Sequence, residues 1–202
     1  MTILALETST SRGSVALWRD GALILDEAFT ADRSHSSALF PILERARALA
    51  PRLDAIAVGL GPGSYAGVRI SIAAALGLAL ADGARLLGLA SVAALETSAP
   101  RYLAIGDARR ETFYFSLVEN GACVEGPLLL DEPVLRERLA ALPQVPVFVP
   151  ALVPAFLHAD VVLPRASRLA ELAAQGKGIL AEGDLEPLYL REPHITQPKA
   201  RA

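Results

Sequence analysis

The expected order of strands, turns and helices occurs twice along this chain, and this repeat restricts the possible folds more than any other feature. A buried strand at residues 2–6 is followed by two extended segments, 14–18 and 23–29, which flank Asp20-Gly21. Extended segments joined by Asp-Gly are typical of a β-hairpin. The same order begins again at residues 102–105. A repeated supersecondary unit predicts an α/β protein with two similar lobes that face each other across a cleft.

The second lobe is expected to be smaller than the first. Its hairpin joins residues 112–118, across Asn120-Gly121, to a strand that begins near Ala122. The first lobe reads as β-β-β-α-β-α-β-α, and the second as β-β-β-α-β with a β-α remnant. We assign residues 1–99 to the first lobe and residues 100–202 to the reduced second lobe and the tail. The other predicted strands are 55–58, 86–89, 145–149 and 161–163, and the predicted helices are 34–50, a segment from the glycine-rich loop to about 81, 91–97, 132–141 and 166–174.

A glycine-rich segment, residues 59–72, joins a predicted strand to a long apolar helix. Its glycines allow backbone conformations that other residues adopt only with strain. Backbone amides at the start of a helix also favour anions. The segment therefore fits either a phosphate-binding loop or a tight, closely packed connection. It lacks both the Lys-Ser/Thr pair of one common nucleotide loop and the three-glycine spacing of the other.

Composition limits the class of protein. The chain has 202 residues, of which 52% are hydrophobic, and this is enough for a sizeable core. Its single cysteine, Cys123, excludes an internal disulfide. A net charge of −3 argues against strong nucleic-acid binding by this chain alone. Because no signal peptide is visible and the apolar run at 70–81 is too short to span a bilayer, we expect a cytoplasmic protein that does not bind membranes.

Several segments resemble those of one known family. Four of them are Ile3-Leu-Ala-Leu-Glu-Thr-Ser-Thr10, Ser34-His35-Ser36 followed by Leu39 and Pro41, Gly61-Pro-Gly-Ser-Tyr-Ala-Gly-Val-Arg-Ile70, and Asp107-Ala-Arg-Arg-Glu111 leading to Tyr114. With Pro187-Leu-Tyr-Leu-Arg191, they resemble the TsaB (YeaZ-type) family, a branch of the actin and sugar-kinase superfamily with its ribonuclease-H-like lobes. The chain departs from the family pattern at Tyr65-Ala66, where Phe-Thr is usual, and at Ser71, where glycine is usual.

The resemblance implies a function in tRNA modification. It implies a non-catalytic scaffold subunit that pairs with the catalytic subunit TsaD and works with the ATPase TsaE. Together these proteins synthesise threonylcarbamoyladenosine at the adenosine next to the anticodon. The chain would meet tRNA only indirectly, through the complex, and would form a homodimer when alone. We expect it to hold no cofactor of its own.

The family's sister subunit, TsaD, binds its catalytic metal through two histidines one helical turn apart. Ser91 and Leu95 stand in these two positions here. Leucine cannot bind a metal, and a serine hydroxyl is a poor ligand. The three histidines of the chain, at 35, 158 and 194, have no neighbouring ligand in the sequence. We therefore expect neither a metal site nor transferase chemistry.

Polar residues at the ends of the first strands are the remaining site candidates. Glu7 fits either a carboxylate that positions a metal-bound phosphate, as in related ATPases, or one that organises the hairpin. The residues of the corresponding vestigial phosphate loops are Glu7, Thr8, Ser9, Gly61, Gly63, Ser64 and Gly67. Asp107, Arg109 and Arg110 fit an ATPase site, a surface that faces tRNA or the ATPase partner, or a surface ion-pair cluster.

The predicted helix after the glycine loop is apolar nearly all round, which suits a helix covered on two sides. One side packs on its own sheet, and the other is covered either by helices of this chain or by a partner. Small residues on it would let another helix approach closely, and a capping or interface role is expected for His35. We predict a partner interface made by His35, Leu39, Ile42, Leu43, Ala73, Leu76, Gly77 and Leu80.

An active ATP-dependent kinase or ATPase with the actin-like fold is the alternative function. The reduced second lobe argues against it. So does the absence of a clear glycine-pair adenosine loop, which Gly176-Lys-Gly178 resembles only weakly.

Overall fold

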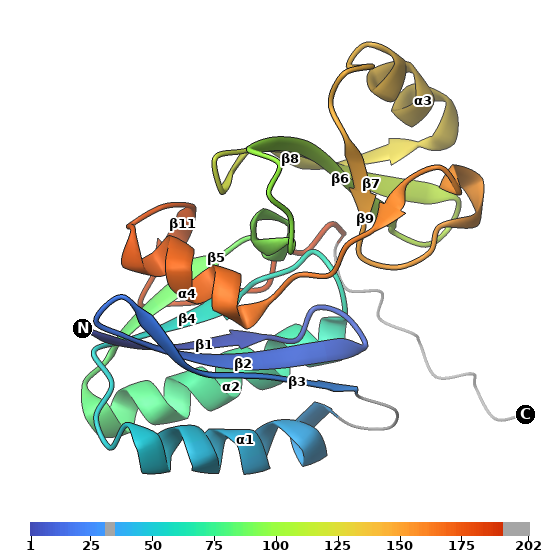
Figure 1. Cartoon of the computed structure of the whole chain (residues 1–202). Helices are drawn as coiled ribbons and strands as arrows, with labels where there is room; N and C mark the ends of the chain where they lie inside the picture. The colour runs from blue at the N-terminus through green and yellow to red at the C-terminus, as the bar shows by residue number, and fades with distance from the viewer. Residues whose placement is uncertain (31–34, 192–202) are drawn as a thin grey trace, which may run out of the picture.

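The computed structural model describes residues 1–30 and 35–191, which form two β-sheets with helices around them (Figure 1). The first sheet contains β1 (Thr2–Glu7), β2 (Arg12–Arg19), β3 (Ala22–Thr30), β4 (Ala55–Gly59), β5 (Arg85–Leu89) and β11 (Ile179–Glu182). Their spatial order is β11-β5-β4-β1-β2-β3. The second sheet contains β6 (Arg101–Asp107), β7 (Thr112–Glu119), β8 (Ala122–Asp131), β9 (Val147–Val149) and β10 (Asp160–Val161), in the order β10-β9-β6-β7-β8. The predicted α/β architecture with two lobes is confirmed.

Both predicted hairpins are present, and their turns explain why. Asp20 and Gly21 have φ angles of 48° and 92°, and Asn120 and Gly121 have φ angles of 52° and 81°. Two successive positive φ angles are the geometry that the tightest hairpin turn requires, and Asp-Gly and Asn-Gly adopt it readily. The turns set the antiparallel pairing of β2 with β3 and of β7 with β8.

Helices α1 (His35–Leu49) and α2 (Tyr65–Asp82) cover one face of the first sheet, and α4 (Ala166–Ala174) covers the other (Figure 1). The hydroxyl of Ser64 caps the start of α2 by accepting a hydrogen bond from the N–H of Gly67. Gly83, at φ 67°, ends the helix in the left-handed conformation. In the second lobe, α3 (Glu132–Ala140) and the 3₁₀ helix η2 (Pro154–Phe156) pack beside a core that includes Phe115, Leu135 and Phe156.

The largest departure from the sequence-based expectation concerns the C-terminal part of the chain. We expected the helix at 166–174 to complete the second lobe, but α4 packs against β1 and β2 of the first. We expected no strand after it, yet β11 pairs with β5 at the edge of the first sheet. The division into 1–99 and 100–202 stays a prediction. The first sheet and its covering helices include elements from both ends of the described chain.

Two smaller expectations also change. The helix predicted at 91–97 is a short 3₁₀ helix, η1 (Ser91–Ala94). The predicted interface residues Leu39, Ile42 and Leu43 are at most 5% exposed, because they face the sheet and belong to the core beneath α1. They are therefore covered by this chain itself. Ser34, where the predicted helix 34–50 begins, lies outside the described residues.

Candidate functional site

Glu7 is the last residue of β1, and its side chain is completely buried. Its Oε1 atom accepts a hydrogen bond of 2.6 Å from the backbone N–H of Ser9, which organises the connection into the hairpin. Within the described part of the chain, Oε2 has no hydrogen-bond partner. Burial raises the pKa of the Glu7 carboxyl above its ordinary value, and the contacts with Ser9 oppose this shift only in part. The fold therefore favours the protonated acid more than water does.

Residue 59 must be glycine because Glu7 and Ser91 fill the space beside it. A Cβ atom there would lie 1.9 Å from Oε2 of Glu7 and 2.6 Å from Oγ of Ser91. Ser91 also holds the next turn: its Oγ accepts from the N–H of Gly61 at 3.0 Å, and its own N–H donates to the Gly61 carbonyl at 2.8 Å. Through these two hydrogen bonds, the buried Ser91 stabilises the conformation of the glycine-rich loop.

Two further glycines bring the loop against the connection between β1 and β2. A Cβ atom on Gly63 would lie 2.1 Å from the carbonyl oxygen of Ser9, and one on Gly67 would lie 2.0 Å from that of Thr8. The N–H of Ser64 donates to the same Ser9 carbonyl at 2.6 Å. The backbone of residues 8–9 therefore occupies the space beside these glycines. Their small size serves contact between two segments of this chain.

Side chains on three elements complete this contact. The hydroxyl of Thr8 donates to the Gly67 carbonyl at 2.8 Å and lies 2.9 Å from Oγ of Ser71, on the buried side of α2. His35, at the start of α1, donates from Nε2 to the carbonyl of Thr10 at 2.9 Å. No polar role was predicted for Ser71, but its hydroxyl extends the hydrogen bonding of Thr8 into the helix.

The second candidate loop, which follows β6, has an unusual backbone. Arg109, Arg110 and Glu111 have φ angles of 66°, 56° and 60°. A left-handed conformation costs a residue with a side chain about 1–2 kcal/mol. Bonds at both ends hold the turn: Oδ1 of Asp107 accepts from the N–H of Arg109 at 2.7 Å, and the Thr112 hydroxyl donates to the Arg109 carbonyl at 2.8 Å. Asp107 and Arg109 also form a surface ion pair at 3.8 Å.

A C-terminal segment, residues 185–191, links the two candidate loops. The N–H of Leu188 donates to the carbonyl of Leu60 in the glycine-rich loop, at 2.8 Å. At its far end, the guanidinium of Arg191 donates to the hydroxyl of Thr112. Sequence reasoning missed this connection, for which the only signal was the resemblance of residues 187–191 to the family's ending.

The same segment adds an aromatic contact at the start of α2. The guanidinium of Arg69 lies 4.0 Å from the centre of the Tyr65 ring, and its Nε donates to the hydroxyl of Tyr189 at 2.9 Å. The two tyrosine rings are 5.7 Å apart. Cation–π contacts of this kind contribute about 0.5–1 kcal/mol at exposed sites. Tyr65, a departure from the family pattern, thus takes part in fastening the C-terminal segment.

The outer face of α2 is exposed and carries one charged residue, Arg69. The side chains of Leu76 and Leu80 are 47% and 78% exposed, and a Cβ atom on Gly77 would meet nothing within 4 Å. By length and composition alone α2 passes as a membrane span, but core helices of soluble proteins pass the same test, so this is weak evidence. The residues exposed along this face are Tyr65, Ala66, Arg69, Ala73, Leu76, Gly77, Leu80 and Ala81.

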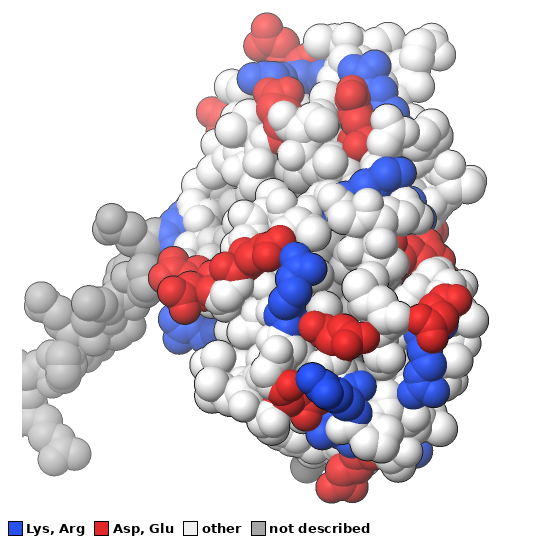
Figure 2. Space-filling view, turned by 90° about the vertical axis from the view of Figure 1, so that its left-hand side faces the viewer, with Lys and Arg blue, Asp and Glu red and all other residues white. Residues whose placement is uncertain are grey.

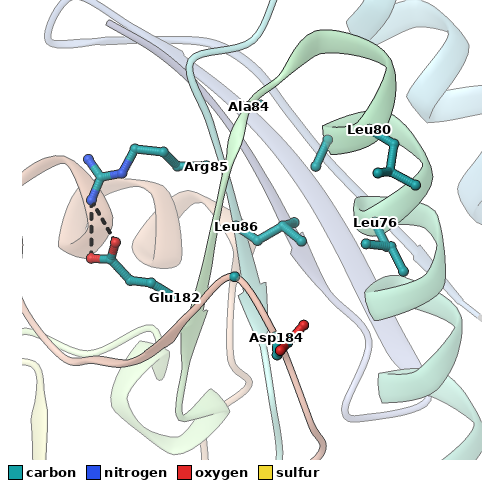
Figure 3. A pocket seen from close by; sticks show the side chains of 9 residues that line it. Leu76, Leu80, Ala84, Arg85, Leu86, Glu182 and Asp184 are labelled. Carbon is teal, nitrogen blue, oxygen red and sulfur yellow. Dashed lines mark hydrogen bonds and ion pairs between the residues drawn. The ribbon is translucent and has the colours of Figure 1, made fainter.

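A groove of about 390 Å³ continues this face toward β5 and β11. Figure 3 shows Leu86 of β5 pointing toward α2, whose Leu76 and Leu80 line the opposite side. Arg85 and Glu182 form an ion pair, at 3.1 Å, on the other side of the strand. The groove and the α2 face together make an apolar surface of the kind that usually marks a partner site.

Charged residues of both signs are interspersed on the face shown in Figure 2, with no large area of a single sign. A protein that binds nucleic acid strongly by itself carries a clustered basic surface. This face lacks that pattern.

Comparison with known proteins identifies the family. The chain is 31% identical over 221 residues to "tRNA threonylcarbamoyladenosine biosynthesis protein TsaB" of Escherichia coli (strain K12), in a match that covers 95% of each chain. This chain belongs to the TsaB family. A solved structure from Pseudomonas aeruginosa, described as an uncharacterized protein with similarity to peptidase YEAZ, is 29% identical and superimposes with a TM-score of 0.74. That superposition covers 94% of this chain and 99% of the other. In addition, the family model "TsaD: tRNA N6-adenosine threonylcarbamoyltransferase" matches residues 29–124.

Ser91 and Leu95, the two residues that we predicted to stand in the histidine positions of the sister subunit, are both buried. Ser91 is 1% exposed and braces Gly61, and Leu95, also 1% exposed, forms an isolated β-bridge with Pro164. Within residues 1–30 and 35–191, no three His, Cys, Asp or Glu side chains lie close enough together to hold a metal ion. His194 lies outside the described residues.

Proposed function

We propose that this chain is a non-catalytic subunit in the synthesis of threonylcarbamoyladenosine in tRNA. The observation that carries the proposal is its similarity, along 95% of both chains, to a protein named for the biosynthesis of that modified nucleoside. In this proposal the chain acts in the cytoplasm, as a scaffold for the catalytic subunit TsaD and together with the ATPase TsaE.

The packing of the glycine-rich loop supports a non-catalytic role. Ser91, Ser9 and Thr8 fill the space beside Gly59, Gly63 and Gly67. A phosphate could enter the Cβ side of these glycines only if Ser91 or residues 7–9 moved. For this reason we interpret the loop as an inherited phosphate-type turn whose present role is to connect β4 to the start of α2. We do not propose the kinase alternative.

The outer face of α2 is the proposed surface for TsaD. Of the interface residues predicted from the sequence, Ala73, Leu76, Gly77 and Leu80 are exposed. His35 is only partly buried and lies beside Gly67, in the first turn of α2. A second copy of this chain would cover the apolar face when TsaD is absent. Asp107, Arg109 and Arg110 remain candidates for a surface that faces tRNA or TsaE in the assembled complex.

Reconstitution from purified subunits tests this proposal. A reaction with TsaD, TsaE, the threonylcarbamoyl-adenylate synthase, ATP and unmodified tRNA is expected to form the modified nucleoside only when this chain is added. Nucleoside analysis of the digested tRNA measures the product. Full modification without this chain would overturn the proposal, and ATP turnover by the isolated chain with a small-molecule acceptor would favour the kinase.

A further inference from the structure

A second cavity lies where the two lobes meet, at the end of β6 opposite Asp107. It has a volume of about 310 Å³ and lies between residues 93–100, the turn at Asn120-Gly121 and the C-terminal end of α4. We call it the junction cavity. Neither Glu7 nor the glycine-rich loop lines it, so it is separate from the candidate site described above.

The lining of the junction cavity is polar and cationic. Arg168 and Lys177 contribute positive charge, and one nitrogen of Arg168 also forms an ion pair with Glu171 at 2.8 Å. None of the lining residues is acidic. Lys177 is the only lysine in the described part of the chain, and it forms no ion pair with an acidic side chain there. The neutral polar side chains on the same cavity are those of Thr97, Ser98, Asn120 and Gln175, besides Tyr102, whose hydroxyl donates to the Val92 carbonyl at 2.7 Å.

The loop that carries Lys177 has a fixed geometry. Gly176 and Gly178 have φ angles of 67° and 66°, and a Cβ atom on Gly178 would lie 2.4 Å from the carbonyl oxygen of Gly121. The N–H of Gly176 donates to Ala173 O at 3.1 Å, and that of Lys177 donates to Leu172 O at 2.9 Å. These bonds are those of a helix ended by a left-handed glycine. They hold the backbone beside Lys177 against the hairpin turn of the second lobe, while Lys177 itself is exposed.

A simpler role for Lys177 is to compensate the negative end of the α4 dipole. That role accounts for Lys177, and the ion pair with Glu171 engages one nitrogen of Arg168. Neither contact accounts for the four neutral hydrogen-bonding side chains around the same space. Charged donors form stronger hydrogen bonds with anionic oxygens than neutral donors do, and a phosphate accepts several bonds at once. The lining therefore matches an anion with several oxygens better than it matches a cation or an apolar group.

We propose that the junction cavity binds a phosphate group, as inorganic phosphate or as the phosphate of a small metabolite. Its volume is near the lower end of small-molecule pockets, which leaves room for more than the phosphate itself. Because the lining comes from both lobes, a bound phosphate stabilises their junction. This inference does not depend on the proposed function in tRNA modification.

Thermal unfolding of the full chain tests the proposal. Inorganic phosphate is titrated against sodium chloride of equal ionic strength, and saturating phosphate is expected to raise Tm by about 2–4 °C. Lys177→Gln is expected to weaken the apparent affinity at least tenfold, whereas Lys177→Arg retains it within about threefold. Arg52→Gln, which removes one exposed cation from the first lobe, is the matched control and is expected to leave binding unchanged.

Two further measurements make the outcome decisive. Amide chemical shifts of Gly176 and Gly178 are expected to move on addition of phosphate, and Arg168→Gln provides a second variant if Lys177→Gln does not fold. Ribose 5-phosphate and AMP distinguish the sources: tenfold tighter binding of either indicates a metabolite, and equal binding indicates free phosphate. Equal effects of phosphate and chloride, or an unchanged response in both variants, would overturn the proposal.

Discussion

The carboxyl group of Glu7 occupies the space that a side chain at residue 59 would need, since a Cβ atom on Gly59 would lie 1.9 Å from Oε2 of Glu7. The buried acid and the glycine depend on each other, although they lie on neighbouring strands and far apart in the sequence. This pair makes the centre of the candidate site sensitive to small changes in volume.

Gly59→Ala is expected to destabilise the protein by about 1–3 kcal/mol, because the added methyl group forces Glu7 or Ser91 to move. Urea unfolding followed by circular dichroism measures the change. Gly77→Ala is the matched control: its Cβ meets nothing within 4 Å, and alanine stabilises a helix interior by about 0.5–1 kcal/mol relative to glycine. Equal stability of wild type and Gly59→Ala would contradict the packing described here.

The raised pKa of Glu7 predicts a specific pH dependence. A carboxyl whose pKa is higher in the folded state than the ordinary 4.5 holds its proton more tightly there than in the unfolded chain. The free energy of unfolding therefore falls as pH rises above about 4.5 toward the folded-state pKa. Glu7→Gln lacks this titration, so its stability is expected to fall less than that of wild type between about pH 4.5 and 7. Parallel stability curves for the two proteins would refute the prediction.

Leu80→Glu is expected to abolish pairing with TsaD while leaving the fold intact, because this side chain is 78% exposed on α2. Loss of a central apolar contact at an interface typically costs 2 kcal/mol or more, or about 30-fold in affinity. Co-purification and light scattering measure the pairing. Leu157→Glu is the matched control, since Leu157 is 70% exposed on the second lobe. If both variants pair normally, the α2 face is not the interface.

Arg110→Gly is expected to change stability by less than about 0.5 kcal/mol. Glycine adopts the left-handed conformation without strain, and this gain offsets its greater freedom in the unfolded chain. Arg136→Gly, inside α3, is expected to cost more than about 1 kcal/mol, because it adds the helix penalty of glycine to the loss of the ion pair with Glu132 and the contact with the Phe156 ring. Denaturant unfolding of both variants checks the difference. A large loss in Arg110→Gly alone would mean that its side chain has a structural role.

The local parts of this fold could be predicted from the sequence, and the long-range parts could not. Asp20-Gly21 and Asn120-Gly121 determine their own backbone geometry, so both hairpins were predictable. The position of α4 depends on contacts such as the hydrogen bond from the N–H of Ala166 to the Ser14 hydroxyl, between residues 152 positions apart. An apolar stripe on a helix shows that something covers it, but not which sheet does so.

The candidate site shows the same limit. The glycine pattern located the loop at residues 59–72, and the end of the first strand located Glu7, Thr8 and Ser9. The structure shows that the two segments contact each other through Gly63 and Gly67. Whether a glycine faces a ligand or another strand of the same protein depends on tertiary packing, which spacing alone does not encode. For the same reason Leu39 and Leu80 both read as interface residues, although only Leu80 reaches the surface.

The place of β11 at the edge of the first sheet has a consequence for synthesis on the ribosome. The strands β1 to β5 emerge early, but β5 is covered by β11 only after residues 179–182 have left the exit tunnel. Until then β5 presents unpaired backbone groups, which attract other chains. A protein cut short after the second sheet would retain this open edge. The first lobe therefore starts to fold first but is completed last. Its solubility is expected to depend on translation continuing until β11 has been synthesised and can pair with β5.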